Sequence, residues 1–559
     1  MSNLLDKASV ILTPTAYNNG EALCVKPSDG SGDFDFSRNS AATRVNAQGL
    51  VENVQSLGSE LVTNGDFDTD SDWSKGTGWS ISGGSANCDG TQTSQTNLLQ
   101  NGLALGTGKI LKITFQLKDY QAGKLIYVNL TGTGVLEFEN INANGTYVAY
   151  SGLSTGDNFI TFRADADFIG SIDNVSVKEV IDNTNLPRIS YENFSYDGSG
   201  NIIPNSGCGS WLFESQSTNV VPYSSDFSQW TGIINLSIGL NEGVSPSGEV
   251  NANLLSLGVD VSATRHRLYL LYNFVLGNEY TFSVFAKKDE QDWFQLMYGA
   301  AFDAQSYANF DLANGVVGNV GTSTDANIVD YGNGWYRCSI TCTATATISS
   351  TYEILTTNNT NSGRYPSYQS TTNTNVCFLW GAQVEQQPYA TSYIPTSGST
   401  VTRNQDVCTN GGSLATINST EGVLYAEIAA LADDGTSRRI TLLESLNNKV
   451  SVILSPTSNS IQGLVLSGGR VQFNQTFATS NTLDFNKIAV SYAENNFALW
   501  VNGVKVRTDT SGVTFSENTL TNISFADGNN TSNKFFGKTK CLAVFPYLTD
   551  AELTELTTI

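Results

Sequence analysis

The stretch Ile110-Leu-Lys-Ile-Thr-Phe-Gln-Leu117 decides the fold class, because apolar and polar residues alternate along it. Successive side chains of a β-strand point to opposite faces, so this alternation predicts a strand with one apolar face and one wet face. Tyr280-Thr-Phe-Ser-Val-Phe285 and Lys487-Ile-Ala-Val-Ser-Tyr492 repeat the pattern, and a wet face is expected on each. Helical spacing of apolar residues is nearly absent. The sequence therefore predicts an all-β chain of sandwiches or jelly rolls.

The length of the chain limits how many domains it can form, and its net charge limits which classes of partner it can bind. At 559 residues, and with ~150 residues per domain, the chain should hold three or four domains. It has 29 Lys and Arg against 52 Asp and Glu, a net charge of −23, which disfavours nucleic acid and anionic lipid as partners. No apolar run reaches the ~18 residues of a membrane span. The N-terminus carries Asp6 beside Lys7 and no long apolar run, so neither membrane insertion nor a signal peptide is expected.

Two local signals near the C-terminus predict specific elements. Asn502-Gly503 lies between two alternating stretches and predicts a tight hairpin, because both residues tolerate positive φ. Residues 548–556 have helical spacing, with Thr549 as N-cap and Glu552 three residues later completing a capping box. We expect this helix to seal one end of the last sandwich.

An internal echo divides the chain. Asn64-Gly-Asp-Phe-Asp, followed by Trp73, is answered by Tyr223-Ser-Ser-Asp-Phe-Ser-Gln-Trp230. The two modules also close alike, at residues 168–179 and 376–385. A final strand that returns beside the first strand of each module would explain this pattern. A shorter echo, Thr43-Arg44 and Thr402-Arg403, is interpreted as linkers or sheet edges.

The modules resemble known carbohydrate-binding folds. Residues 58–181, with Asn64-Gly-Asp-Phe67, Trp73, Trp79 and Ile172-Asp-Asn-Val-Ser-Val177, resemble carbohydrate-binding modules of the family 4/9 type, which implies a galactose-binding-like jelly roll. Residues 212–400 resemble a more distant version of that fold. After a linker at 401–409, residues 410–559 resemble the laminin G/concanavalin A-like lectin sandwich, on the strength of the stretches 497–506 and 535–545.

Two further strips resemble proteins of tailed-bacteriophage virions. The strip that ends in Phe36-Ser-Arg-Asn-Ser-Ala-Ala-Thr-Arg-Val-Asn-Ala-Gln-Gly-Leu50 resembles the start of fibre or appendage proteins, and so does Leu186-Pro-Arg-Ile-Ser-Tyr191 with the stretch 210–219. In such proteins the two strips usually follow each other directly. The resemblance therefore implies a virion-associated segment, residues 1–57 continued in 182–211, into which residues 58–181 are inserted.

Catalysis finds little support in the sequence. His266 is the only histidine, and its place between two arginines at the start of a strand predicts an exposed structural residue. Neither a G-x-S-x-G motif, a P-loop nor an H-E-x-x-H motif occurs. A glycosidase needs only two carboxylates, which cannot be picked out of 52 acidic residues. The chain is predicted not to be an enzyme, with a glycan-cleaving tailspike kept as an alternative.

The run Asp66-Phe-Asp-Thr-Asp-Ser-Asp72 places four carboxylates at alternate positions. Clustered carboxylates repel one another unless a cation lies among them, which makes calcium one interpretation. The resemblance implies a structural calcium ion that joins the first strand to the last, with Asp66, Asp68 and Asp173 as ligands. A solvated acidic turn is the other interpretation, and the residues leave both open.

Aromatic side chains are the candidate glycan contacts, because sugar rings stack their apolar faces on Trp and Tyr. The candidates are Trp79, Tyr365, Tyr368, Tyr389 and Trp500. Core packing is the alternative for the two tryptophans. Plain surface is the alternative for the tyrosines, which lie in Pro- and Ser-rich loops.

Together these features predict a non-enzymatic phage virion appendage, a head or tail fibre or decoration protein, that binds cell-surface polysaccharide. Its other partners would be virion proteins and further copies of itself, with a trimer favoured. The protein would be assembled in the host cytoplasm and released by lysis. A purely structural virion component without sugar binding is the main alternative.

Overall fold

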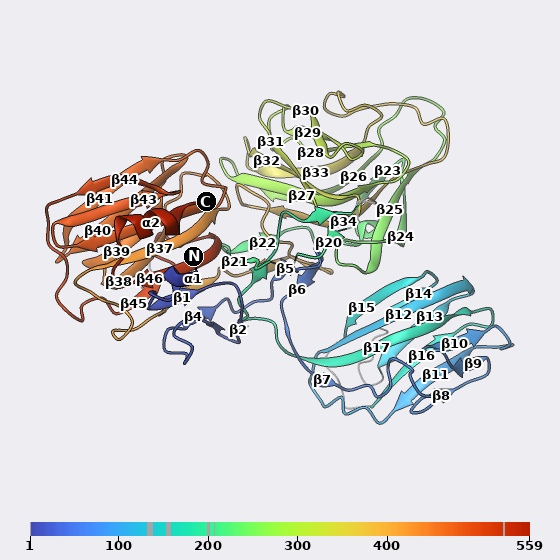
Figure 1. The fold of residues 1–559 in the computed structure, drawn as a ribbon. Helices are drawn as coiled ribbons and strands as arrows, with labels where there is room; N and C mark the ends of the chain where they lie inside the picture. Colours follow the sequence, from blue (N-terminus) through green and yellow to red (C-terminus); the bar gives the residue numbers. More distant parts are fainter. Residues whose placement is uncertain (1, 131–137, 152–157, 198–201, 206, 529–531) are drawn as a thin grey trace.

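The chain folds into three β-sandwiches (Figure 1). A computed structural model describes residues 2–130, 138–151, 158–197, 202–205, 207–528 and 532–559. In these ranges strands predominate, and the helical elements are α1 (Ser2–Leu5), α2 (Asp550–Thr557) and the single turn η1 (Phe227–Gln229). The predicted all-β fold class is confirmed. Over the same ranges, no helix has the length and apolar character needed to cross a membrane.

The first sandwich encloses a core that includes Trp73, Phe115 and Phe162. One sheet has the order β15 (Gly145–Tyr150), β12 (Leu111–Ala122), β17 (Ile169–Asp182), β10 (Ala86–Asp89) and β9 (Trp79–Ile81), with β7 (Ser56–Glu60) also paired to β17. The facing sheet has the order β14 (Phe138–Ile141), β13 (Leu125–Leu130), β16 (Phe159–Ala164), β11 (Thr96–Asn101) and β8 (Ser74–Lys75).

The second sandwich encloses a core that includes Phe282, Tyr298 and Tyr352. Its outer sheet has the order β23 (Gly232–Ile234), β26 (Arg267–Phe274), β33 (Ile348–Thr356), β28 (Trp293–Tyr298), β29 (Tyr307–Asp311) and β30 (Val316–Val320). The facing sheet has the order β24 (Ser237–Val244), β25 (Val250–Leu257), β34 (Thr374–Glu385), β27 (Glu279–Lys288), β32 (Trp335–Thr343) and β31 (Asp325–Asp330).

The third sandwich draws strands from distant parts of the chain. Its larger sheet has the order β18 (Ile189–Ser190), β21 (Ser210–Phe213), β46 (Gly537–Phe545), β37 (Gly422–Ala430), β42 (Asn486–Ala493), β43 (Asn496–Val501) and β44 (Val504–Asp509), with β1 (Val10–Leu12) also paired to β46. The facing sheet has the order β41 (Arg470–Ala478), β40 (Ser460–Ser467), β39 (Asn448–Leu454), β38 (Arg438–Ser445) and β45 (Asn522–Ser524). Both termini lie in this sandwich (Figure 1).

The N-terminal segment and residues 182–211 help to build this third core. β1 and β21 lie end to end along one edge of β46, at residues 542–544 and 537–539. Val10, Phe34 and Trp211 are buried among the residues of the last 150 positions. An unpaired strand edge exposes backbone donors and acceptors, so these two short strands complete the sheet.

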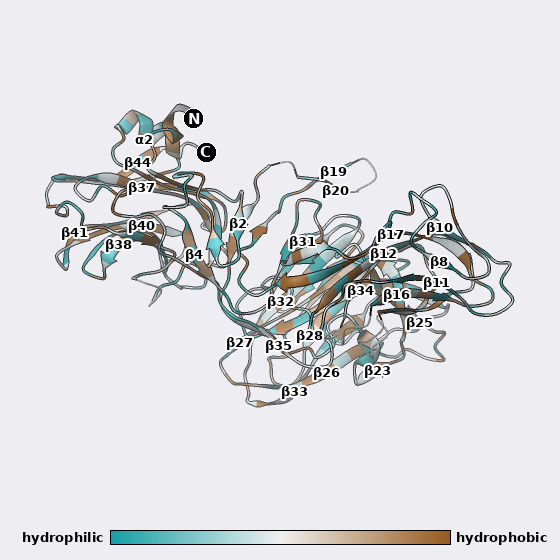
Figure 2. Ribbon diagram, turned by 90° about the horizontal axis from the view of Figure 1, so that it is seen from below, coloured by the Kyte–Doolittle hydropathy of each residue, from teal (hydrophilic) through white to brown (hydrophobic). Residues whose placement is uncertain are grey.

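Short strand pairs tie the sandwiches together. They are β2 (Tyr17–Asn18), β3 (Glu21–Ala22), β4 (Phe34–Ser37) and β36 (Val407–Thr409) in one small sheet, and the pairs β5 (Thr43–Val45) with β6 (Val51–Asn53), β22 (Ser217–Asn219) with β35 (Val401–Arg403), and β19 (Ser195–Tyr196) with β20 (Ile202–Ile203). The β19–β20 hairpin stands out from the sheets (Figure 2). It lies against Gly332 of the second sandwich, where an added Cβ would fall 2.3 Å from Ile202.

The sequence echo corresponds to a shared local structure. The Trp73 indole N–H donates to the Asn64 carbonyl over 3.0 Å, and the Trp230 indole N–H donates to the Tyr223 carbonyl over 3.2 Å. The closing strands also return as expected. The Val175 N–H donates to Gly65 over 2.8 Å, and its counterpart Ala382 N–H donates to Ser224 over 2.7 Å.

Two local predictions at the C-terminus are confirmed in detail. The hairpin turns at Asn502 and Gly503, with φ of 49° and 82°. α2 begins after Thr549, and the capping box with Glu552 is present. The expected position of the helix is wrong, because α2 packs on the outer face of the larger sheet, over Ala489 and Trp500, instead of sealing an end.

The predicted wet faces are also wrong for two of the three strands. In β27 both faces are buried, because Phe285 packs outside the main core with Trp335 and Trp380. In β42 the second face is covered by α2. Only β12 keeps alternating burial, over Leu111–Leu117.

The close approach of Gly65 to the last strand of its sandwich generates a stability prediction. A Cβ at Gly65 would lie 2.0 Å from the Val175 carbonyl oxygen, so Gly65→Ala must push the two backbones apart. We expect a loss of about 1–3 kcal/mol in the free energy of unfolding, read by thermal denaturation. Gly258→Ala is the control, since a Cβ there meets nothing within 4 Å. Equal unfolding curves for the two variants would contradict the prediction.

Candidate functional site

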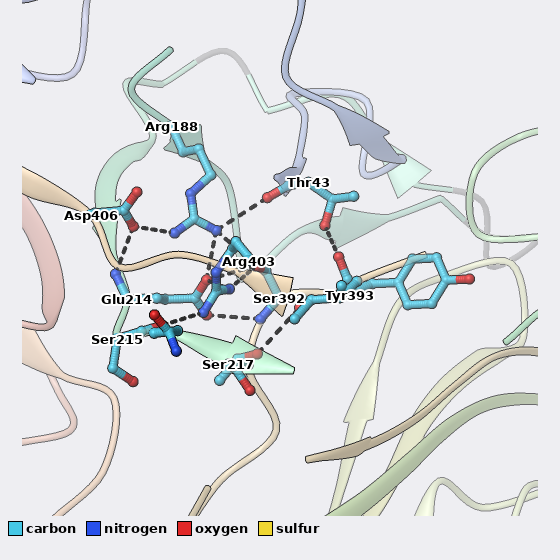
Figure 3. Close-up of polar contacts among 12 residues, drawn as sticks. Thr43, Arg188, Glu214, Ser215, Ser217, Ser392, Tyr393, Arg403 and Asp406 are labelled. Atoms are coloured by element: carbon cyan, nitrogen blue, oxygen red, sulfur yellow. Dashed lines mark hydrogen bonds and ion pairs between the residues drawn. The ribbon is translucent and has the colours of Figure 1, made fainter. Parts of the chain in front are cut away.

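Five charged side chains are buried together where distant segments of the chain meet. This buried charge cluster consists of Arg38, Arg188, Glu214, Arg403 and Asp406, each no more than 4% exposed. Figure 3 shows most of the cluster, with Arg188 between Asp406 and Glu214. Arg38 comes from the N-terminal segment, Arg188 from the segment that follows the first sandwich, and Glu214 from the position directly after β21. Arg403 and Asp406 come from the segment after the second sandwich. The cluster thus requires all four segments to be in place at once.

The contacts within the buried charge cluster are dense. Arg188 donates to Glu214 Oε2 over 2.6 Å and pairs with Asp406 through its other terminal nitrogen. Arg403 pairs with the same Glu214 carboxylate, and Arg38 donates to Asp406 over 3.2 Å. The backbone N–H of Glu214 donates to Asp406 over 2.8 Å. Buried charges are tolerated only when they are paired and hydrogen-bonded in this way.

The pKa values follow from burial and pairing. Burial alone would raise the pKa of Glu214, but Arg403 and Arg188 outweigh it and lower that pKa to about 2. For Arg38, burial dominates the attraction of Asp406 and lowers the pKa to about 10. Both groups are therefore charged at neutral pH.

A cleft of about 1390 Å³ opens beside the buried charge cluster, and Glu214 and Ser392 contribute to its lining. One wall is formed by β31 and β32 of the second sandwich. The opposite wall comes from the third sandwich, at residues 430–434 and at Lys538. The segment 190–196, which leads into the β19–β20 hairpin, closes a third side. The cleft therefore exists only because the sandwiches are held against each other.

The cleft combines aromatic rings with carboxylates and hydroxyls. Tyr191, Phe194, Tyr196 and Tyr331 line it, and Tyr196 is 37% exposed. Burial and the neighbouring Asp330, to which the Tyr196 hydroxyl donates a hydrogen bond, raise the pKa of that hydroxyl to about 12. Ring faces beside hydrogen-bonding groups are the means by which proteins hold sugars, which offer an apolar face and a rim of hydroxyls.

The polar part of the lining comes from strand residues whose side chains face out of the second sandwich. They are Asp325, Asn327, Ser339, Thr341 and Thr343. On the third sandwich, Asp434 is held by Arg438 over 2.8 Å, and Lys538 pairs with Glu192, which also lines the cleft. The charged side chains of the lining are therefore mostly acidic.

Of the five predicted glycan-contacting aromatics, Tyr389 lies in this cleft. Its hydroxyl lies near Ser215, and burial, with Glu214 next in effect, raises its pKa. Trp79 belongs to the core of the first sandwich, and Trp500 is buried between the larger sheet of the third sandwich and α2, at 7% and 3% exposed respectively. Their ring faces are covered, by Phe168 for Trp79 and by the α2 layer for Trp500, which matches the core-packing alternative.

Tyr365 and Tyr368 lie elsewhere, on the second sandwich. Tyr368 packs against the core there, and its hydroxyl contacts Thr356 at 2.5 Å. Tyr365 is half-buried on the outer sheet, surrounded by arginines. The five predicted residues thus fall at four separate places and do not form one site.

The three predicted calcium ligands are not brought together as a metal site. Asp173 is paired with Lys118 at 2.6 Å, so an ammonium group already neutralises it. Asp66 and Asp68 are exposed in a turn that Asn64 closes through its own amide, which donates to Thr69 over 2.7 Å. Among the described residues, no three His, Cys, Asp or Glu side chains are placed to hold a metal ion. The geometry favours the solvated acidic turn, and calcium binding stays a prediction.

His266 is buried, at 1% exposed, and the predicted exposure is wrong. Its Nε2 lies 2.8 Å from Asp260 Oδ2, and its ring packs on Tyr368. The strand that begins here alternates, so Arg265 and Arg267 face outward while His266 points into the sandwich. These side-chain contacts include no serine or cysteine that the imidazole could activate.

Apart from Tyr389, the aromatic residues that line the cleft were missed by the sequence reasoning. The signal that could have found them is Tyr191-Glu-Asn-Phe-Ser-Tyr196, which interleaves three rings with polar residues outside any long strand. Tyr331 gives no such signal, because only the packing of the sandwiches places it opposite that segment.

Comparisons with known proteins add little to this geometry. No protein-family model and no curated protein sequence matches the chain. The structure of the N-terminal CBM22-1-CBM22-2 tandem domain of Xyn10C from Paenibacillus barcinonensis is similar at 13% identity and a TM-score of 0.18, over 60% of this chain and 99% of that one. An anti-sigma factor domain-containing protein is similar at 11% identity and a TM-score of 0.14, over 55% and 83%. Both TM-scores are too low to support a conclusion about the site.

The pairing of Glu214 generates a prediction about stability. In Glu214→Gln, Arg188 and Arg403 lose a shared carboxylate inside the protein, which should cost about 3–5 kcal/mol of unfolding free energy. Glu179→Gln, which breaks an exposed pair with Lys109, should cost at most about 1 kcal/mol. Calorimetric unfolding measures both. A Glu214→Gln protein as stable as the control variant would contradict the assignment.

The same carboxylate predicts an acid sensitivity. Its pKa is about 2 in the folded chain and 4.5 ordinarily, so its stabilisation is present above pH 4.5 and is lost as the pH falls toward 2. The unfolding temperature of the wild type should therefore drop over this range, and that of Glu214→Gln should drop less. Parallel pH profiles for the two proteins would show that Glu214 is not the responsible group.

Proposed function

We propose that this chain is a non-enzymatic glycan-binding appendage of a tailed-bacteriophage virion, and that the cleft between the second and third sandwiches receives a segment of cell-surface polysaccharide. The observation that carries the proposal is the lining of that cleft, where Phe194 and Tyr196 stand beside fixed carboxylates and hydroxyls. Its size, about 1390 Å³, suits several sugar units rather than one small ligand.

The charge of the chain supports a sugar over other polymers. A net charge of −23 and an acidic cleft wall repel phosphate backbones and anionic membranes. A neutral saccharide carries no such penalty, and its hydroxyls donate well to carboxylates such as Asp330 and Asp325.

The virion setting is supported by the resemblance of residues 1–57 and 182–211 to phage fibre and appendage proteins. In this setting the partners are other virion proteins and further copies of the chain, with a trimer favoured. Several copies on one particle make weak cleft affinities sufficient, because each bound site raises the effective concentration of the next. Assembly takes place in the host cytoplasm, and lysis releases the protein with the virion.

The test measures retention and cleavage together. The purified chain is mixed with host-surface polysaccharide, and both the bound fraction and newly formed reducing ends are recorded, with and without a calcium chelator. We expect retention without new reducing ends. Phe194→Ala and Tyr196→Ala should each weaken retention about tenfold, because each removes a stacking ring. Tyr547→Ala, which removes a tyrosine that is 57% exposed outside the cleft, should have no effect.

Other outcomes discriminate between the alternatives. New reducing ends would replace the adhesin with a glycan-cleaving tailspike. A folded protein that shows neither retention nor cleavage would leave the purely structural virion component. Loss of retention on chelation would locate a calcium requirement, which the variant Asp66→Asn would then have to reproduce.

A further inference from the structure

A second cluster of functional groups lies on the outer sheet of the second sandwich, away from the cleft lining. This arginine–tyrosine cluster consists of Arg265, Arg267, Arg364, Tyr269 and Tyr365. Three guanidinium groups lie over one ring, with their carbons 4.7 Å (Arg265), 5.9 Å (Arg267) and 4.5 Å (Arg364) from the Tyr365 centroid. Arg267 also lies 4.9 Å from the ring of Tyr269. Three guanidinium groups and two aromatic rings therefore lie in mutual contact on this sheet.

The charges of the arginine–tyrosine cluster are not balanced. Glu353 beneath it is fully buried, and accepts from Arg267 over 2.8 Å and from the Tyr365 hydroxyl over 2.9 Å. Arg364 donates to the neutral Tyr298 carbonyl, and its Nε is buried without a partner. Arg265 is exposed, and within the described part of the chain no acidic side chain pairs with it. One carboxylate thus faces three guanidinium groups, in a chain whose net charge is −23.

Tyr365 adopts an unfavourable backbone conformation, which hydrogen bonds with buried side chains hold in place. Its φ is 61°, a region that bulky residues avoid at a cost of about 1–3 kcal/mol. The Tyr365 N–H donates to the buried Gln295 side chain over 3.1 Å, and Gln295 in turn holds the Gly363 carbonyl. Asn309 fixes the preceding loop through the carbonyls of Thr360 and Ser362. Buried amides therefore fix the loop that presents the Tyr365 ring and Arg364.

We propose that the arginine–tyrosine cluster binds the acidic groups of an anionic glycan, with Arg265 and Arg364 taking a carboxylate or sulfate and the rings of Tyr365 and Tyr269 contacting the sugar. A guanidinium group matches such an oxyanion through two parallel N–H donors. Leu271, 60% exposed on the same face of β26, extends the apolar surface beside the rings. This site is independent of the proposed cleft function, because it shares no residue with the cleft lining.

The test is calorimetric titration of the full chain with a short oligogalacturonate, a heparin-derived oligosaccharide and the methyl-esterified oligogalacturonate. We expect binding of the first or second and none of the neutral ester, with affinity falling as salt is raised. The stronger of the two acidic probes identifies carboxylate or sulfate as the preferred group. Arg265→Ala should weaken binding about tenfold, and Arg265→Lys should weaken it less, since charge remains without the planar donors.

Controls separate this site from the cleft and from general charge effects. Arg470→Ala removes an exposed arginine of the third sandwich and should change nothing. Tyr196→Ala, in the cleft, should leave oligogalacturonate binding intact. The proposal is overturned if Arg265→Ala binds like wild type, if the neutral ester binds equally well, if duplex DNA binds as tightly as the oligosaccharides, or if no acidic probe binds. If Tyr196→Ala abolishes binding, the anion sits in the cleft and the proposal is again wrong.

Discussion

The sharing of two carboxylates by three buried guanidinium groups is the constraint on which the arrangement of this molecule depends. Arg38, Arg188 and Arg403 each sit at no more than 2% exposure, and Glu214 and Asp406 bridge them. Burying a charged group without a partner costs several kcal/mol of folding free energy. Each of these groups is therefore stable in the interior only while its partners are present. The five residues come from segments separated by up to 368 positions. Their pairing therefore fixes the path of the N-terminal segment, the return from the inserted sandwich and the exit from the second sandwich in a single arrangement.

This arrangement gives the molecule a large cleft. The walls belong to separately packed sandwiches, and the lining reaches down to Glu214 of the buried charge cluster. The outer sheet of the second sandwich offers a different surface, where arginines and tyrosines replace the acidic lining. Under the two proposals made above, these surfaces of unlike charge would suit a polymer that mixes neutral and acidic sugars.

Local sequence patterns were enough to predict the all-β class, the strand at 110–117, the turn at Asn502-Gly503 and the capping box at Thr549. Each of these features depends on neighbouring residues only. Long-range packing decided the rest. The alternation predicts that Phe285 and Ala489 face solvent. In the structure, Trp335 and Trp380 pack on Phe285, and α2 covers Ala489. Trp79 and Trp500 have the aromatic rings on which sugars stack, but neighbouring residues bury both rings. Arg403 sits in a sequence echo with Arg44, but Arg44 pairs with Glu52 near the surface while Arg403 is buried. No local pattern distinguishes those two arginines.

The cleft is the centre of this account, and the most direct measurement is a structure of the chain in complex with an oligosaccharide prepared from host-surface polysaccharide. The account predicts sugar rings against Phe194 and Tyr196, with hydroxyls within hydrogen-bonding distance of Asp330 and the side chains of β31 and β32. Sugar bound at another surface while the cleft stays empty, at a concentration that saturates binding in solution, would contradict it.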